Sequence, residues 1–229
     1  WTFPRVLLDS PIDDRDAGIL ETAKGTLLAT TFTSNAYDEY YLKKGSHKNW
    51  PEKRREQWLA AHNRVSALAR KKELGNWMIR STDGGVTWSP RYDSLVNSPH
   101  GPVNLKDGRI IYPGKNLWHE KIWIGVCESN DDGQSWKRLA QIPTRKGDDP
   151  ENYHELHGVE AINGNLVVHI RNHNKANNGE TLQTESTDGG KTWSEPVSIG
   201  VWGLPSHLLR LIDGRLLMSY GHRRQSLGN

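Results

Sequence analysis

The sequence contains a single cysteine, Cys127, so an internal disulfide and a cysteine-based metal cluster are both excluded. No apolar run approaches the roughly 18 residues that a membrane-spanning helix needs. An excess of charge of one sign is also missing, because 30 Lys and Arg stand against 27 Asp and Glu without a basic tract. The net charge of +3 therefore gives no electrostatic reason to expect binding of nucleic acid.

Tryptophan and glycine are what the sequence has in quantity. Ten Trp and 22 Gly stand beside only two Phe and two Met. Chains rich in glycine turns, with few long apolar stretches, usually form many short strands. The 229 residues can bury a sizeable core. Composition therefore predicts an all-β fold, with residues 1–229 forming a single domain.

A turn motif with the pattern S-x-D-x-G-x-[ST]-W occurs three times. The copies start 48 and 57 residues apart, at Ser81–Trp88, Ser129–Trp136 and Ser186–Trp193. Ser and Asp side chains accept hydrogen bonds from nearby backbone amides, while Gly adopts backbone angles closed to other residues. The Trp can pack against a neighbouring sheet. The three aspartates of the motif are therefore predicted to form turns rather than to act in catalysis: Asp83, Asp131 and Asp188.

This motif resembles the Asp-box, and the chain is similar to the six-bladed β-propellers of the sialidase family. The resemblance implies a propeller whose boxes lie at the periphery, away from the active site. Between the boxes, pairs of apolar segments flank glycine turns, a strong hairpin signal. These turns are Lys24-Gly25, Asp107-Gly108, Asn163-Gly164 and Asp213-Gly214. Four hairpins and three boxes predict about four blades where six are expected, so we expect a fragment of a longer chain.

Residues 51–74 form the one clearly helical stretch. Pro51 suits a first helical turn and Gly75 suits a stop. A helix here would have one largely apolar face, made of Trp58, Leu59, His62, Val65, Leu68 and Ala69. We interpret this helix as an insertion packed on the rim of the propeller. A lid or a partner-binding surface is the alternative.

Candidate functional residues follow from their distance to each hairpin glycine. In a propeller the innermost strands line a central channel, and side chains at the strand ends face the ligand. Seven to ten positions before the glycines lie Arg15, Asp16, His100, His154, Glu155, His157 and His207. Seven to nine positions after them lie Lys115, Arg171, His173 and Arg223. This recurrence predicts a ring of polar residues that binds an anionic or polyhydroxyl ligand.

Residues 154–171, with the sequence HELHGVEAINGNLVVHIR, give the closest local match to sialidases. In that family a Glu acts as base on a tyrosine nucleophile, and an Arg binds the sialic-acid carboxylate. The resemblance implies these roles for Glu155 and Arg171. A phenol with a pKa of about 10 needs a nearby carboxylate to become nucleophilic. A guanidinium offers the planar fork that a carboxylate fits.

Arg15 matches the first arginine of the sialidase triad, although the proline of the family's R-I-P motif is missing. Only 140 residues separate Arg15 from Glu155, fewer than the family usually has. Either a blade is missing, or Arg15 matches only at the level of the repeat. The acid/base aspartate is expected at Asp16 or Asp38. The third arginine has no clear match, since the fourth hairpin offers only Arg223, and the tyrosine would lie in the last blade, which is absent.

Three histidines, His100, His157 and His207, occupy similar positions before their hairpin glycines. They could hydrogen-bond to sugar hydroxyls or to the channel wall. They could instead act as acid and base, as a polysaccharide lyase would use them, with His100 as the candidate catalytic group. Binding of a metal ion is a third option, since three or four such ligands are needed.

These observations predict an exo-acting, sialidase-like glycoside hydrolase that removes a terminal acidic sugar from a glycan or glycoconjugate. Glu155, Asp16 and His100 are its candidate catalytic residues. Substrate contacts are predicted for Arg15, Arg171, Lys115, His157, His207 and Arg223. Neither a cofactor nor a metal ion is predicted. Two alternatives on the same fold are a histidine-using glycosidase or lyase and a non-catalytic carbohydrate-binding propeller. We expect a secreted or periplasmic protein, although no signal peptide is visible.

Overall fold

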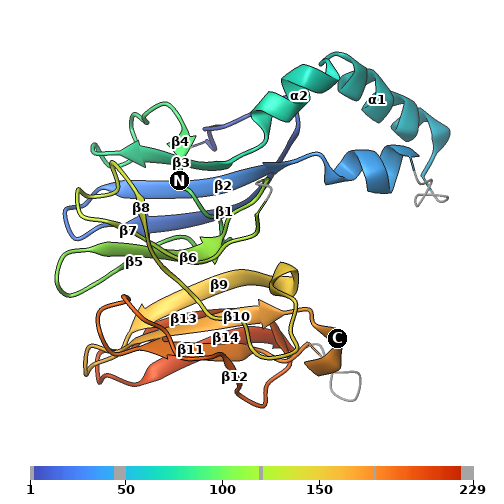
Figure 1. Cartoon of the computed structure of the whole chain (residues 1–229). Helices are drawn as coiled ribbons and strands as arrows, with labels where there is room; N and C mark the ends of the chain where they lie inside the picture. The colour runs from blue at the N-terminus through green and yellow to red at the C-terminus, as the bar shows by residue number, and fades with distance from the viewer. Residues whose placement is uncertain (1–2, 44–49, 119–120, 178, 223–229) are drawn as a thin grey trace.

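The computed structural model describes residues 3–43, 50–118, 121–177 and 179–222. The fold is all-β, with one helical insertion between β2 and β3 (Figure 1). The strands are β1 Asp13–Glu21, β2 Leu27–Ser34, β3 Asn76–Ser81, β4 Tyr92–Asp93, β5 Val103–Asn104, β6 Ile110–Lys115, β7 Ile124–Ser129, β8 Lys137–Gln141, β9 Tyr153–Glu160, β10 Leu166–Asn172, β11 Leu182–Ser186, β12 Val197–Ser198, β13 Gly203–Arg210 and β14 Leu216–His222. The helical segments are η1 Asp38–Lys43, α1 Glu52–Asn63, α2 Ala67–Glu73, η2 Pro150–Asn152 and η3 Lys175–Asn177.

The strands form four separate antiparallel sheets, numbered here in chain order. Sheet one has the strand order β1-β2-β3-β4, sheet two β5-β6-β7-β8 and sheet three β9-β10-β11-β12. In the described residues, sheet four is the hairpin of β13 and β14. The all-β prediction is confirmed. The first two strands of every sheet form the hairpins that the glycine turns predicted.

Apolar side chains fill the spaces between successive sheets. Leu28 and Met78 of sheet one pack with Ile110 and Tyr112 of sheet two. Cys127 is fully buried in the same cluster. A larger cluster joins sheets two and three and includes Ile111, Ile124, Val126, Leu156, Leu166, Val168 and Ile170. Val159, Val167 and Leu208 join sheet three to sheet four. Burial between sheets is therefore the main source of stability.

The three S-x-D-x-G-x-[ST]-W turns share one set of hydrogen bonds. In the first turn, Ser81 Oγ donates to Asp83 Oδ1 at 2.8 Å, and Thr87 Oγ1 donates to Asp83 Oδ2 at 2.6 Å. The same two bonds, with the same lengths, recur at Asp131 and at Asp188. The bonds from Thr87 and Ser81 lower the pKa of Asp83 to about 2. These carboxylates therefore have their partners within the turns, as expected for turn-forming residues.

Asp132 ties the second turn to sheet one. Its side chain is 7% exposed and accepts hydrogen bonds from Thr22 Oγ1 and Thr26 Oγ1, each at 2.6 Å. Arg80 Nη2 also donates to the carboxylate at 2.6 Å. Burial opposes ionisation of Asp132, but these hydrogen bonds outweigh it and lower the pKa. Asp132 has a φ of 62°, in the left-handed region, where the other two turns have glycine.

Arg109 makes the corresponding link between sheet two and the third turn. Its Nη1 donates to the carbonyl of Gly189 at 3.0 Å and to Glu128 Oε2 at 3.1 Å. Its Nε donates to Asp107 Oδ2 at 2.8 Å. The second turn, which belongs to sheet two, is therefore bonded to sheet one. The third turn, which belongs to sheet three, is bonded to sheet two.

The helical insertion differs from the prediction of one helix over residues 51–74. It consists of two helices, and neither α1 nor α2 contains a buried residue. The helix is interrupted between them because the Ser66 side chain accepts a hydrogen bond from Ala69 N at 3.2 Å and so caps the start of α2. Leu68, predicted on the apolar face, is 66% exposed. Leu59 packs only partly, against a small cluster near η1.

Two substitutions at Asp132 measure separately what its hydrogen bonds and its backbone conformation contribute to the free energy of unfolding. Asp132→Gly should lower the free energy of unfolding by about 3 kcal/mol, because Arg80 and two threonines lose a buried acceptor. Asp132→Ala should be about 1 kcal/mol less stable again, since alanine disfavours positive φ. Urea unfolding monitored by tryptophan fluorescence measures both effects. Unchanged stability in both variants would contradict the proposed link.

Candidate functional site

Most of the predicted site residues that the structure describes lie at or near one end of the sheets, which we call the site end. There β1 and β9 begin while β6 and β10 finish, and the helical insertion leaves β2 at this same end (Figure 1). The three S-x-D turns lie at the other end, because Leu27 pairs both with Glu21 of β1 and with Ser81 at the first turn. The two motifs found in the sequence are therefore separated by the length of the strands.

Asp16 and Glu155 occupy matching irregularities in β1 and β9. Each lies nine residues before its hairpin glycine, and their φ angles are 43° and 42°. The pairing register of β1 shifts between Arg15 and Gly18, and that of β9 with β10 shifts at the level of Glu155. Bulges redirect side chains, and non-glycine residues at positive φ concentrate at functional sites. Two carboxylates are thus held in the same unusual backbone conformation on sheets one and three.

Glu155 forms an ion pair with Arg171, whose Nη1 donates to Glu155 Oε1. Both side chains are 21% exposed. Arg171 Nε donates to His173 Nε2 at 2.7 Å. Glu155 Oε2 is buried and has no hydrogen-bond partner, and Arg171 Nη2 has none among the described residues. Within the described residues, the pair therefore leaves one carboxylate oxygen and one guanidinium nitrogen without a partner.

Lys115 and His154 lie close to this pair. Lys115 is 8% exposed, and its Nζ donates to the carbonyl of Glu151 at 2.6 Å. Burial lowers the pKa of Lys115. The rings of His154 and His173 are 4.9 Å apart between centroids. Burial, followed by the charges of Lys115, His173 and Arg171, lowers the pKa of His154 to about 4.

The structure brings His100, His157 and His207 together. The rings of His157 and His207 are stacked at 3.9 Å, and the centroid of His100 lies 4.9 Å from that of His157. His207 Nδ1 is 3.3 Å from His100 Nδ1. Leu208 N donates to His157 Nδ1 at 2.8 Å, so the proton of neutral His157 is on Nε2. His100 Nε2 is buried without a partner.

These three histidines have lowered pKa values, with burial as the main cause. The pKa of His100 falls to about 4 and that of His157 to about 2. Neighbouring imidazoles add to the shift at both residues, and burial also lowers the pKa of His207. At neutral pH the cluster is uncharged, so it can accept protons or hydrogen bonds but does not act as a cation.

Arg15 and Asp16 are separate from the Glu155–Arg171 pair. No hydrogen bond or ion pair between described residues joins the two groups. Arg15 Nε lies 3.7 Å from Asp13 Oδ2, with both side chains 43% exposed. Arg15 and Asp16 together line a cavity of about 270 Å³ on sheet one.

Of the remaining candidates, Asp38 lies on η1 and pairs with Lys43 Nζ at 3.1 Å. Arg223 lies outside the described residues. His169 is a neighbour that the turn-counting rule missed. It is buried, bonds to Gln183 Oε1 at 3.0 Å and lies two residues before Arg171 in β10. Alternation along the strand, which places residues i and i+2 on one face, is the signal that could have found it.

The described residues contain no group of three or more His, Cys, Asp or Glu side chains arranged to hold a metal ion. The histidine cluster is consistent with this, because His157 Nδ1 already accepts a backbone hydrogen bond. In the part of the chain that the structure describes, no helix is long and apolar enough to span a membrane.

Residues 51–228 match the family model of the BNR repeat-like domain. The chain belongs to this BNR repeat-like family. No curated protein sequence matches the chain.

Solved structures share the fold of this BNR repeat-like chain. A protein of unknown function from Dyadobacter fermentans aligns over 99% of the chain, with a TM-score of 0.70 and 24% identity. A Hadza microbial sialidase aligns over 91%, with a TM-score of 0.58 and 18% identity. An α-L-arabinanase of Penicillium chrysogenum, solved with arabinobiose, aligns over 93%, with a TM-score of 0.57 and 16% identity. The chain spans 62%, 40% and 58% of those proteins respectively.

The neutral histidines predict a loss of stability in acid. An unfolded histidine has a pKa of about 6.5, so between about pH 6.5 and pH 4 the unfolded chain binds protons that folded His100 and His154 do not. The free energy of unfolding should therefore fall by about 1.4 kcal/mol per pH unit for each such proton. Urea unfolding at several pH values measures the slope. His100→Gln should make it shallower, and an unchanged slope would refute the assignment.

Proposed function

We propose that the protein is an exo-acting glycoside hydrolase that removes a terminal acidic sugar, with Glu155 and Arg171 at the centre of its site. The observation that carries the proposal is the Glu155–Arg171 pair. It combines a carboxylate at positive φ, a partnerless buried oxygen and a guanidinium with a free nitrogen. Membership of the BNR repeat-like family and the likeness of the fold to a sialidase support it.

In this proposal each residue of the site has a distinct role. Glu155 Oε2 accepts the proton of a tyrosine nucleophile supplied by a further part of the chain. Arg171 binds the carboxylate of the sugar, for which its planar fork is suited. Lys115 adds positive charge beside that carboxylate. Asp16, held in the matching bulge of sheet one, is the candidate acid/base group.

Further substrate contacts are proposed for His157, His207, Arg15 and Arg223. The neutral imidazoles suit hydrogen bonds to sugar hydroxyls, and His157 would donate through Nε2–H because its Nδ1 already accepts from Leu208 N. Arg15 is exposed at the site end of β1 and would bind the same anionic sugar from sheet one. We also propose that the enzyme is secreted or periplasmic, where glycans and glycoconjugates are accessible, and that it needs no cofactor.

The four sheets are proposed to belong to a six-bladed propeller whose three described turns are Asp-boxes at its rim. The support is apolar surface at both ends of the row of sheets. On sheet four, Leu209 is 52% and Leu217 is 51% exposed, and on sheet one Ile19 is 67% exposed. Further sheets of a longer chain would cover these faces, as sheets two and three cover their neighbours.

A histidine-using glycosidase or lyase is the second candidate. The observation that favours it is His100, whose buried Nε2 has no hydrogen-bond partner among the described residues and whose ring lies beside those of His157 and His207. A neutral imidazole with a free nitrogen can act as a general base at neutral pH. In this case His100, rather than Glu155, would carry the reaction.

The first test uses the full-length protein and a fluorogenic sialoside. We expect Glu155→Gln to reduce kcat by about 100-fold or more, because the amide cannot take a proton. Glu160→Gln is the matched control. Glu160 lies on the same strand, but next to the hairpin turn at the other end of the sheet, so the control should keep full activity. Unchanged turnover in Glu155→Gln would disprove the role of Glu155, and loss in His100→Gln alone would favour the second candidate.

Arg171 provides an independent prediction about substrate charge. Arg171→Lys keeps the positive charge but removes the planar fork, so we expect kcat/KM to fall about 10- to 100-fold, the equivalent of losing one charged hydrogen bond. Steady-state kinetics with the same sialoside measures the loss. Equal activity of Arg171→Lys and the parent protein would show that Arg171 does not bind the carboxylate.

A further inference from the structure

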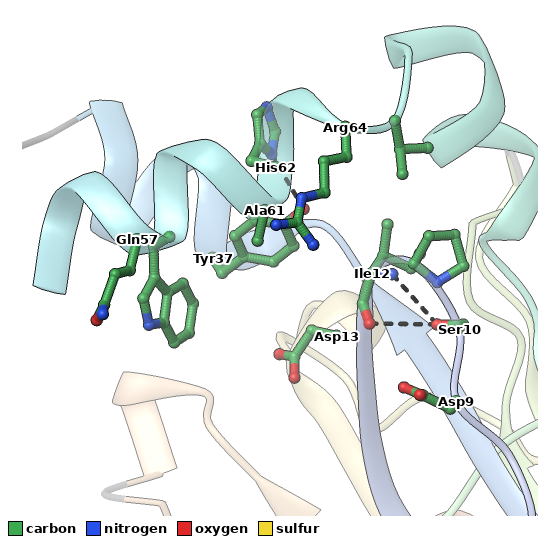
Figure 2. A pocket seen from close by; sticks show the side chains of 12 residues that line it. Asp9, Ser10, Ile12, Asp13, Tyr37, Gln57, Ala61, His62 and Arg64 are labelled. Carbon is green, nitrogen blue, oxygen red and sulfur yellow. Dashed lines mark hydrogen bonds between the residues drawn. The ribbon is translucent and has the colours of Figure 1, made fainter.

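A second pocket, which we call the rim pocket, lies between the helical insertion and the segment that leads into β1 (Figure 2). Its volume is about 660 Å³, within the range of small-molecule binding sites. One wall comes from the insertion, and the other comes from residues 9–13. The insertion wall includes Tyr37, Gln57, Trp58 and Arg64, and the other wall includes Asp9 and Asp13.

The insertion wall of this rim pocket is aromatic and is held in place by other aromatic rings. The ring of Trp58 makes edge contacts with Tyr37, Tyr41 and Trp50, at centroid distances of 6.0, 5.8 and 5.1 Å. Tyr37 also hydrogen-bonds through its hydroxyl to His62 Nδ1 at 3.1 Å. Despite these contacts Trp58 remains 36% exposed. A large, preorganised aromatic surface therefore lines a cavity.

The opposite wall of the rim pocket is polar. Figure 2 shows the carboxylates of Asp9 and Asp13 on this side, with Gln57 and Arg64 on the helical side. The side chains of Asp9, Gln57 and Arg64 make no hydrogen bond or ion pair with any described residue. These groups are therefore available to bind a ligand that has hydroxyl groups.

The rim pocket lies beside Arg15, one of the residues proposed above to bind the acidic sugar. Asp13 lines the pocket, and its Oδ2 lies 3.7 Å from Arg15 Nε, the arginine assigned above to the acidic sugar. The insertion leaves sheet one at the site end, the same end of the sheets at which β9 and β10 of sheet three carry the Glu155–Arg171 pair (Figure 1). A ligand that extends from the site toward sheet one would meet this pocket.

We propose that the rim pocket binds a neutral sugar unit of a glycan whose terminal acidic sugar occupies the site around Glu155. This inference rests on the proposed function. The apolar face of a sugar ring packs on an aromatic side chain such as Trp58, and its hydroxyls donate to carboxylates and to an amide such as Gln57. The two carboxylates of the lining, Asp9 and Asp13, outnumber its one guanidinium, Arg64, so the net negative charge disfavours a second acidic sugar and suits an uncharged one.

The test compares two substrates of the full-length protein. Sialyllactose carries a neutral disaccharide next to the sialic acid, whereas a fluorogenic sialoside carries only a coumarin. We expect Trp58→Ala to lower kcat/KM for sialyllactose about tenfold, through loss of the aromatic contact, and to leave the fluorogenic substrate unaffected. Gln57→Ala, which leaves the aromatic cluster intact, should change the two substrates in the same selective way.

Tyr40→Ala is the matched control, because Tyr40 is an aromatic residue of the insertion that is 60% exposed and does not line the pocket. It should not alter either activity. Equal loss on both substrates in Trp58→Ala and Gln57→Ala would show a purely structural role and overturn the proposal, as would no loss on either.

A binding measurement with lactose alone distinguishes failure of the proposed function from failure of the rim-pocket inference. If the parent protein hydrolyses neither sialoside, lactose binding is measured by nuclear magnetic resonance. Binding that is abolished in Trp58→Ala and retained in Tyr40→Ala would still support the rim pocket as a site for neutral sugar. Absence of lactose binding up to about 10 mM would overturn it.

Discussion

The hydrogen bonds inside the three S-x-D-x-G-x-[ST]-W turns set the register of the third and fourth strands of their sheets, and the rest of the fold depends on that register. Each turn uses its serine and aspartate locally, so the carboxylate needs no partner elsewhere. With this end of sheets one, two and three closed by side-chain hydrogen bonds, the other end is free to carry polar and charged groups. The site residues lie there because the turns occupy the opposite end.

Much of the fold could be predicted because its signals are local. Glycines that must adopt positive φ mark the hairpins, and the S-x-D pattern identifies the turns. The proximity of His100, His157 and His207 followed from counting back from these glycines. The backbone conformation of Glu155 could not be predicted in this way, because a glutamate carries no signal for positive φ and only the register shift with β10 produces it.

The helical insertion, in contrast, could not be predicted correctly from its sequence pattern. Periodicity over residues 51–74 predicted one helix, yet the Ser66 cap divides it, and no residue of the predicted apolar face is fully buried. A helical periodicity of apolar residues predicts a buried helix face only where a hydrophobic core lies against that face. Here the aromatic contacts of Trp58 replace a core, and the wall of a pocket is formed by residues far apart in sequence. Such a pocket has no sequence signature.

Asp132 has a consequence for how the sheets are ordered along the chain. The second turn alone has a side chain at the position where the other turns have glycine, and that side chain fits Arg80 and two threonines of sheet one. The repeats look alike in their motif, but they are not interchangeable. Exchanging two repeats would leave the partly buried Arg80 without its carboxylate, so the chain encodes the succession of its sheets and not only their shape.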